Sequence, residues 1–190
     1  MMFVGNKQKT VIGIDNGTTG TISVFVGNKL VEFMLTPHYV QQSYTKEINN
    51  VSRIDFTELL DLFSKYNKNC FAVLERPLSN PERYNQSMIA LRAFEATIIA
   101  LGLSSIDYLV IDSKRWQRRY LKGFGGEALK RECTKLGIEE YPQYEKLITD
   151  HGDADGIYIG KCVIDGIIKF GEKQKVKKPK QEIRKFDSNV

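Results

Sequence analysis

The apolar positions of this chain are grouped first at strand spacing and later at helix spacing. Residues 10–15, TVIGID, form an apolar run that ends in an acid, and residues 21–26 and 30–36 show a similar strand-like pattern. The Gly-Asn pair within residues 27–29 is a hairpin signal, so we predict three antiparallel strands at the start. Residues 37–53 are polar and show no period, which predicts irregular structure.

Strands and helices alternate in the rest of the chain. Asp55 and Glu58 have the spacing of a capping box, which predicts that a helix begins here. The predicted elements that follow are a buried strand at 70–75, a helix at 86–101, a strand at 108–111 and helices at 113–121, 127–136 and 152–169. This order indicates an α/β fold in which helices cover both faces of a mixed sheet.

The positive charge of the chain is concentrated near its C-terminal end. The net charge is +5, and residues 169–185 hold eight Lys or Arg against two Glu. We therefore predict one folded domain at 1–168 and a basic tail at 169–190. Such a tail is typical of phosphate binding, for which Lys177 and Lys178 are candidates, but also of a merely solubilising end.

The cysteines and the apolar runs indicate the compartment. Cys70, Cys133 and Cys162 are odd in number and fit no metal-binding spacing, which predicts free thiols in a reducing environment. No purely apolar stretch reaches the ~20 residues that span a bilayer, so we expect no membrane partner. We expect a cytoplasmic or nucleoid-associated protein.

Three acids occur in settings where an unpaired charge is costly. Asp15 ends the first predicted strand, Glu75 ends the fourth, and Asp155 lies in a small, apolar helical segment. If the two strands are neighbours, Asp15 and Glu75 converge at one sheet edge, and a late helix can bring Asp155 there. Such a carboxylate cluster suits Mg²⁺, for which Mn²⁺ can substitute.

Each acid taken alone also has an ordinary interpretation. Asp15 can be a turn residue, Glu75 can pair with Arg76 or Arg83, and Asp155 can be a helix-start acid. The three together, in this order, favour the metal site.

Four segments resemble those of the RuvC-type Holliday junction resolvases of the ribonuclease H-like superfamily, including phage and viral members. They are IGIDNGTTGTISVF, AVLERP, HGDADGIYIGKCV and the basic region RWQRRYLKG with KRECTKLGIEEYP. The resemblance covers roughly residues 10–168. It implies a ribonuclease H-like fold and a Mg²⁺-dependent endonuclease that nicks four-way junction DNA symmetrically, leaving 5′-phosphate and 3′-hydroxyl ends.

The resemblance also assigns roles to individual residues. It implies that Asp15, Glu75 and Asp155 bind metal, and that Lys130 reaches the scissile phosphate. The apolar helix at 86–101 is expected to form a homodimer, although simple core packing explains it equally well. The compact motifs and the basic tail favour a phage or viral source.

The fourth metal ligand has two candidates. His151 lies four residues before Asp155, on the same face of a continuous helix. A shifted alignment instead pairs Asp150 with Asp153. In the first alternative, Asp153 points away from the site, toward solvent or DNA, because a helix turns about 100° per residue.

A basic segment with aromatic residues is the strongest candidate for DNA contact. Its five basic residues are Lys114, Arg115, Arg118, Arg119 and Lys122. Trp116 and Tyr120 can stack on an unpaired base or join the core, and Phe124 can be a wedge or a loop anchor.

Two other functions remain as alternatives. The VIGIDNGTTG hairpin would also serve a sugar-kinase or actin-like ATPase as a phosphate-binding turn. That fold requires a second phosphate motif, which the sequence lacks. The third alternative is a catalytically degenerate module that binds branched DNA without cutting it.

Overall fold

A five-stranded sheet organises the fold, in the order β3-β2-β1-β6-β7. The computed structural model describes residues 8–42 and 50–175. The strands are β1 (Thr10–Ile14), β2 (Thr21–Val26), β3 (Lys29–Leu35), β6 (Cys70–Glu75) and β7 (Asp107–Ile111). β2 pairs antiparallel with β1 and β3, whereas β6 pairs parallel with β1 and β7. The predicted mixed sheet, with three antiparallel strands first, is confirmed.

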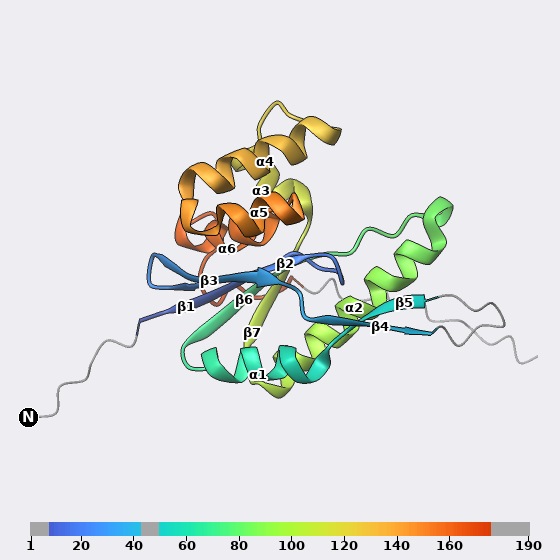
Figure 1. Cartoon of the computed structure of the whole chain (residues 1–190). Coiled ribbons are helices and arrows are strands. Elements are labelled where there is room, and N and C mark those ends of the chain that lie inside the picture. Colours follow the sequence, from blue (N-terminus) through green and yellow to red (C-terminus); the bar gives the residue numbers. More distant parts are fainter. Residues whose placement is uncertain (1–7, 43–49, 176–190) are drawn as a thin grey trace, which may run out of the picture.

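Helices cover both faces of this sheet, as predicted (Figure 1). One face carries α1 (Phe56–Tyr66) and α2 (Tyr84–Leu103), and the other carries α3 (Ser113–Tyr120), α4 (Gly126–Glu140), α5 (Glu145–His151) and α6 (Asp155–Ile164). Two short 3₁₀ turns, η1 (Pro81–Arg83) and η2 (Pro142–Tyr144), precede α2 and α5.

The alternation of side chains in β1 separates two cores. Ile12 and Ile14 lie in a buried cluster with residues of α1 and α2. Val11 lies in the opposite cluster, with residues of α3, α4, α5 and α6. Because the side-chain period of a strand is two, residues 13 and 15 also face the second group of helices.

The prediction of irregular structure at 37–53 is wrong for most of its described residues, and its residues 43–49 lie outside the part that the structure describes. β4 (His38–Gln42) and β5 (Asn50–Ile54) form a separate antiparallel pair that extends from the domain (Figure 1). The strand residues are mostly exposed or half-buried, and only Ile54 is buried. The pair has no continuous apolar face, so its sequence lacks the alternation that identifies a half-buried strand.

The predicted helix at 152–169 is shorter than expected, because α6 occupies only Asp155–Ile164 of this segment. α5 ends at His151, where Gly152 adopts a left-handed φ of 70°, and α6 begins at Asp155. Glycine tolerates this conformation without the Cβ clash that other residues suffer, so it ends the helix. Ahead of α6, the side chain of Asp153 accepts a hydrogen bond from the backbone N–H of Asp155 at 2.7 Å.

The segment after α6 contacts the domain. Glu172 pairs with Arg115 at 2.9 Å, and the side chain of Gln174 accepts a hydrogen bond from the backbone N–H of Val110 in β7. Lys177 and Lys178 lie outside the described residues.

One helical stretch is unusually long and apolar. Pro81–Leu103, which joins η1 and α2, is long and apolar enough to cross a membrane by length and composition, contrary to our expectation that no stretch would be. This is weak evidence, because core helices of ordinary domains pass the same test. α2 packs against α1 and β5.

The close approach of β1 and α6 provides a first prediction. A Cβ atom at Gly13 would lie 2.2 Å from the backbone nitrogen of Gly160 and 2.3 Å from the backbone oxygen of Gly156. Backbone atoms cannot rotate aside, so we expect Gly13→Ala to destabilise the fold by about 3 kcal/mol in urea unfolding. Gly102→Ala is the matched control, because its Cβ would meet nothing within 4 Å. A Gly13→Ala protein as stable as Gly102→Ala would contradict this packing.

Candidate metal centre

The ends of β1 and β6 bring two of the predicted acids to one edge of the sheet. Ile14 pairs with Leu74 in the parallel register, so Asp15 and Glu75 are the next residues of neighbouring strands. Both follow the alternation that turns their side chains toward α3–α6. Asp15 and Glu75 therefore lie side by side at one edge of the sheet, as expected.

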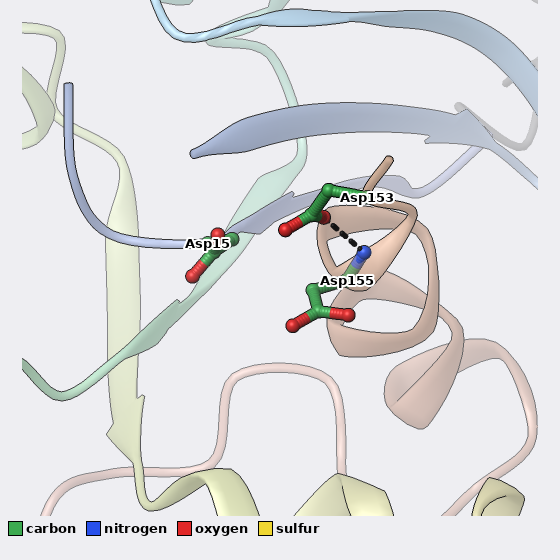
Figure 2. A group of neighbouring side chains, drawn as sticks. All are labelled: Asp15, Asp153 and Asp155. Carbon is green, nitrogen blue, oxygen red and sulfur yellow. Dashed lines mark hydrogen bonds between the residues drawn. The ribbon is translucent and has the colours of Figure 1, made fainter. Parts of the chain in front are cut away.

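α6 adds two further carboxylates. Asp15, Asp153 and Asp155 each offer an oxygen, and these oxygens lie within 4.8 Å of one another. Figure 2 shows the side chains of Asp153 and Asp155 at the start of α6, on the side that faces Asp15 at the end of β1. All three are half-buried residues.

Of the two alternatives for Asp153, the one in which it points toward solvent or DNA is wrong, because Asp153 lies in this group of carboxylates. That expectation assumed a continuous helix through 152–169, but residue 153 precedes α6 and does not follow helical geometry. Its Oδ1 accepts hydrogen bonds from the backbone N–H of Asp155 and, at 3.3 Å, from the hydroxyl of Thr21. These bonds hold Asp153 in the cluster, and Thr21 is a contributor that the sequence did not indicate.

The other candidates for the fourth ligand have different partners. His151 Nε2 lies 2.8 Å from the backbone oxygen of Thr19, in the turn between β1 and β2. Asp150 pairs with Lys146, one helical turn earlier in α5. Neither residue belongs to the group of three carboxylates.

Glu75 borders this group and has a neutral partner. The indole N–H of Trp116 donates a hydrogen bond to Glu75 Oε2 at 2.6 Å. Burial raises the pKa of Glu75 to about 7, the charges of Asp153 and Asp112 also raise it, and the Trp116 hydrogen bond lowers it.

The pKa values of Asp155 and Asp15 are raised for similar reasons. The pKa of Asp155 is raised to about 7, chiefly by burial and then by the charges of Asp153 and Glu75, against the lowering effects of Cys133 and Lys130. Burial also raises the pKa of Asp15 well above its usual range, with contributions from the same acids. Acids this close cannot all be charged without a compensating cation.

The chemistry of the donors fits a divalent cation. Carboxylate oxygens are the ligands that hard cations such as Mg²⁺ and Mn²⁺ prefer. A thiol also touches the site, because the buried Cys133 in α4 donates to Asp155 Oδ1 at 3.0 Å. That contact was not foreseen, since cysteine at this spacing carries no sequence signal.

Lys130 is the cationic neighbour of the acids. It is an exposed residue of α4, and its charge lowers the pKa of both Asp15 and Asp155. The charge of Lys130 therefore acts on two of the three clustered carboxylates.

α3 divides into a buried and an exposed side. Trp116 is 0% exposed and belongs to the core, which decides between its two interpretations. Tyr120 is half-buried, and its hydroxyl donates to Asp165 at 3.0 Å. Phe124, in the loop that follows, is exposed.

Most of the predicted DNA-contacting residues lie on the surface. Those of α3 and the following loop that are exposed are Lys114, Arg115, Arg118, Arg119 and Lys122. Arg115 is engaged by Glu172, so it is less available to a phosphate than the others.

Comparison with known proteins supports the fold. No family model matches the sequence, and no curated protein matches it. Among solved structures, Thermus thermophilus RuvC in complex with a Holliday junction substrate is similar over 84% of this chain and 97% of that chain, at 12% identity and a TM-score of 0.50. A second Thermus thermophilus RuvC structure matches over 80% of this chain and 90% of that chain, at 14% identity and a TM-score of 0.43.

The first likeness, together with the order of the strands, shows a ribonuclease H-like fold of the RuvC kind. This confirms the predicted fold class.

Proposed function

We propose that this chain is a divalent-metal-dependent endonuclease that nicks branched DNA, with four-way junctions as its substrate. The observation that carries the proposal is the cluster of Asp15, Asp153 and Asp155 at the end of β1, beside Glu75. In a purely structural cluster each acid would ordinarily pair with an Arg or Lys, whereas these half-buried acids raise one another's pKa more than Lys130 lowers it. Enzymes that hydrolyse phosphodiesters with divalent metal ions hold those ions with clustered carboxylates of this kind.

The chain's own residues would supply the following. Asp15, Asp153 and Asp155 would hold Mg²⁺ or Mn²⁺, with Glu75 as a further ligand. When bound, such ions activate a water and stabilise the leaving 3′ oxygen, so that the products are a 5′-phosphate and a 3′-hydroxyl. Lys130 would orient the scissile phosphate and offset its charge.

The basic surface beside the site would hold the DNA backbone. Lys114, Arg118 and Arg119 are exposed on the helix whose buried Trp116 contacts Glu75. Contacts of this kind position a duplex without reading its sequence, so we propose recognition by shape. Lys177 and Lys178 would add phosphate contacts from the tail.

A homodimer completes the proposal, because a four-way junction presents two symmetric strands to be nicked. α2 exposes large apolar side chains, with Leu91 at 40%, Ile99 at 53% and Leu103 at 66% exposed. An apolar surface of this kind is typical of an interface. We also propose that the protein acts in a reducing compartment with nucleic acid, and that it is of phage or viral type.

The test is incubation of the protein with a synthetic immobile four-way junction, with Mg²⁺ or with a chelator. We expect paired nicks across the junction that a ligase can reseal, in Mg²⁺ only, and at least tenfold slower cleavage of a linear duplex with the sequence of one arm pair. A tenfold preference requires only about 1.4 kcal/mol of differential binding.

Two outcomes would contradict the proposal. ATP hydrolysis without DNA cleavage would favour the kinase-like or actin-like ATPase. Tight binding of the junction without cleavage in Mg²⁺ or Mn²⁺ would favour the catalytically degenerate DNA-binding module.

A further inference from the structure

The only tryptophan of the chain lies against the acidic site. Trp116 is 0% exposed and packs in the core beneath α3. Its Nε1–H donates to Glu75 Oε2 at 2.6 Å, a short distance for a neutral N–H donor. A buried indole must place its N–H on an acceptor, and here that acceptor is a carboxylate of the proposed metal centre.

This hydrogen bond makes the two carboxylate oxygens of Glu75 differ in their availability to a metal ion. Oε2 is occupied by the indole, and it is held there because the ring is fixed in the core. Within residues 8–42 and 50–175, Oε1 of Glu75 has no hydrogen-bond partner and can take a cation. A neutral donor also leaves the negative charge of Glu75 in place, which an Arg or Lys partner would offset.

We propose that Trp116 is a positioning residue that restricts Glu75 to binding metal through one oxygen, and that this restriction favours Mg²⁺ and Mn²⁺ over Ca²⁺. The inference rests on the proposed function, because it takes Glu75 to be a metal ligand. Trp116 itself touches neither metal nor DNA in this account.

The physical basis is the difference between the cations. Mg²⁺ is small and demands near-octahedral geometry, which one oxygen per carboxylate satisfies. Ca²⁺ is larger, takes more oxygens and often binds both oxygens of one carboxylate. If the indole N–H is removed, Glu75 can rotate and offer both oxygens, so the site should become more favourable for Ca²⁺ and less so for Mg²⁺.

Two altered proteins separate the hydrogen bond from the packing. Trp116→Phe removes the N–H and part of the ring. A tryptophan analogue with sulfur in place of the indole N–H, incorporated biosynthetically, removes only the donor and keeps the shape. Because the chain has one tryptophan, the analogue enters at this position alone.

Tyr66→Phe is the matched control. The hydroxyl of Tyr66 donates to Glu32 Oε2 at 2.5 Å, so this variant also removes an aromatic donor from a carboxylate. Both residues lie away from the metal centre, on α1 and β3.

The measurement is the dissociation constant of each protein for Mg²⁺, Mn²⁺ and Ca²⁺ by calorimetry, with a melting curve to verify the fold. Loss of a hydrogen bond to a metal ligand typically weakens metal binding about 10-fold to 100-fold. We expect Mg²⁺ and Mn²⁺ affinities to fall about 10-fold in both altered proteins. Ca²⁺ affinity should stay or rise, so that the preference for Mg²⁺ over Ca²⁺ falls by the same factor. Tyr66→Phe should behave as wild type.

The outcomes distinguish this inference from the proposed function. An unchanged Mg²⁺ to Ca²⁺ preference in the analogue protein, while the wild type binds Mg²⁺ and nicks junctions, overturns the role of Trp116 alone. A uniform loss of affinity for all three cations also overturns it, because that indicates a structural role without selectivity. A wild type that binds no divalent cation overturns the proposed function and this inference together. If Trp116→Phe does not fold, the analogue protein decides.

Discussion

Asp15→Asn is expected to lower the rate of metal-dependent junction nicking by about 10³-fold, which corresponds to about 4 kcal/mol of transition-state stabilisation. Asp15 lies in the group of three carboxylates, and its pKa is raised by burial and by the charges of Asp153, Asp155 and Glu75. Asparagine keeps the size of the side chain but removes the negative charge on which divalent-cation binding depends. The measurement is the single-turnover rate of nicking in saturating Mg²⁺.

Binding of the junction should survive the same change. Removing a negative charge beside the DNA reduces repulsion of the phosphates, so we expect the affinity measured by mobility shift in a chelator to be equal or higher. Asp150→Asn is the control, because Asp150 is an acid of similar size that pairs with Lys146 outside the cluster. An Asp15→Asn protein that cuts within tenfold of the Asp150→Asn protein would refute the assignment of the site.

The second large effect concerns pH and the stability of the metal-free protein. The pKa values of Glu75 and Asp155 are raised to about 7 in the folded state, from their ordinary values of 4.5 and 3.8. The folded state therefore holds protons that the unfolded state releases, and the free energy of unfolding falls as pH rises from about 4 to about 7. The free energy of unfolding should change by on the order of 3 kcal/mol for one such group, because one pKa unit corresponds to about 1.4 kcal/mol.

This dependence should disappear when metal is bound. A divalent cation displaces the protons and offsets the carboxylate charges, so we expect Mg²⁺ to stabilise the protein far more at pH 8 than at pH 5. The measurement is urea unfolding at both pH values, with Mg²⁺ or a chelator. Asp155→Asn should be more stable than wild type at pH 8 in the chelator. Equal stability of the metal-free wild type at pH 5 and pH 8 would show that the acids are not crowded as the structure indicates.

Some parts of the site were accessible from sequence because they depend on local pattern. An apolar run that ends in an acid is visible in TVIGID and in CFAVLE, and two parallel neighbours place such acids at one edge. The period of two along β1 then determines that Asp15 faces α6 and that Ile14 faces α1 and α2.

Other parts of the site could not be predicted, because they depend on where α5 ends and α6 begins. The position of Asp153 follows from the helix stop at Gly152, whose left-handed conformation a helical pattern through 152–169 conceals. His151 was placed near the metal by helical spacing from Asp155, but the interruption sends it to the backbone oxygen of Thr19. The strands β4 and β5 were not predicted, because their residues share no buried face and therefore show no alternation of apolar and polar positions.

The amino-acid sequence by itself determined the α/β class, the three antiparallel strands at the start and the candidate acids Asp15, Glu75 and Asp155, because hydrophobic period and chain order act locally. The tertiary structure alone decided that Asp153 completes the cluster, that Trp116 holds Glu75, and that Cys133 touches Asp155. The hydrogen bond between Trp116 and Glu75 joins residues 41 positions apart, and the one between Cys133 and Asp155 joins residues 22 positions apart. Both form because α3 and α4 pack against the sheet. No periodicity records a contact of that kind, since its partners meet only after the helices have docked.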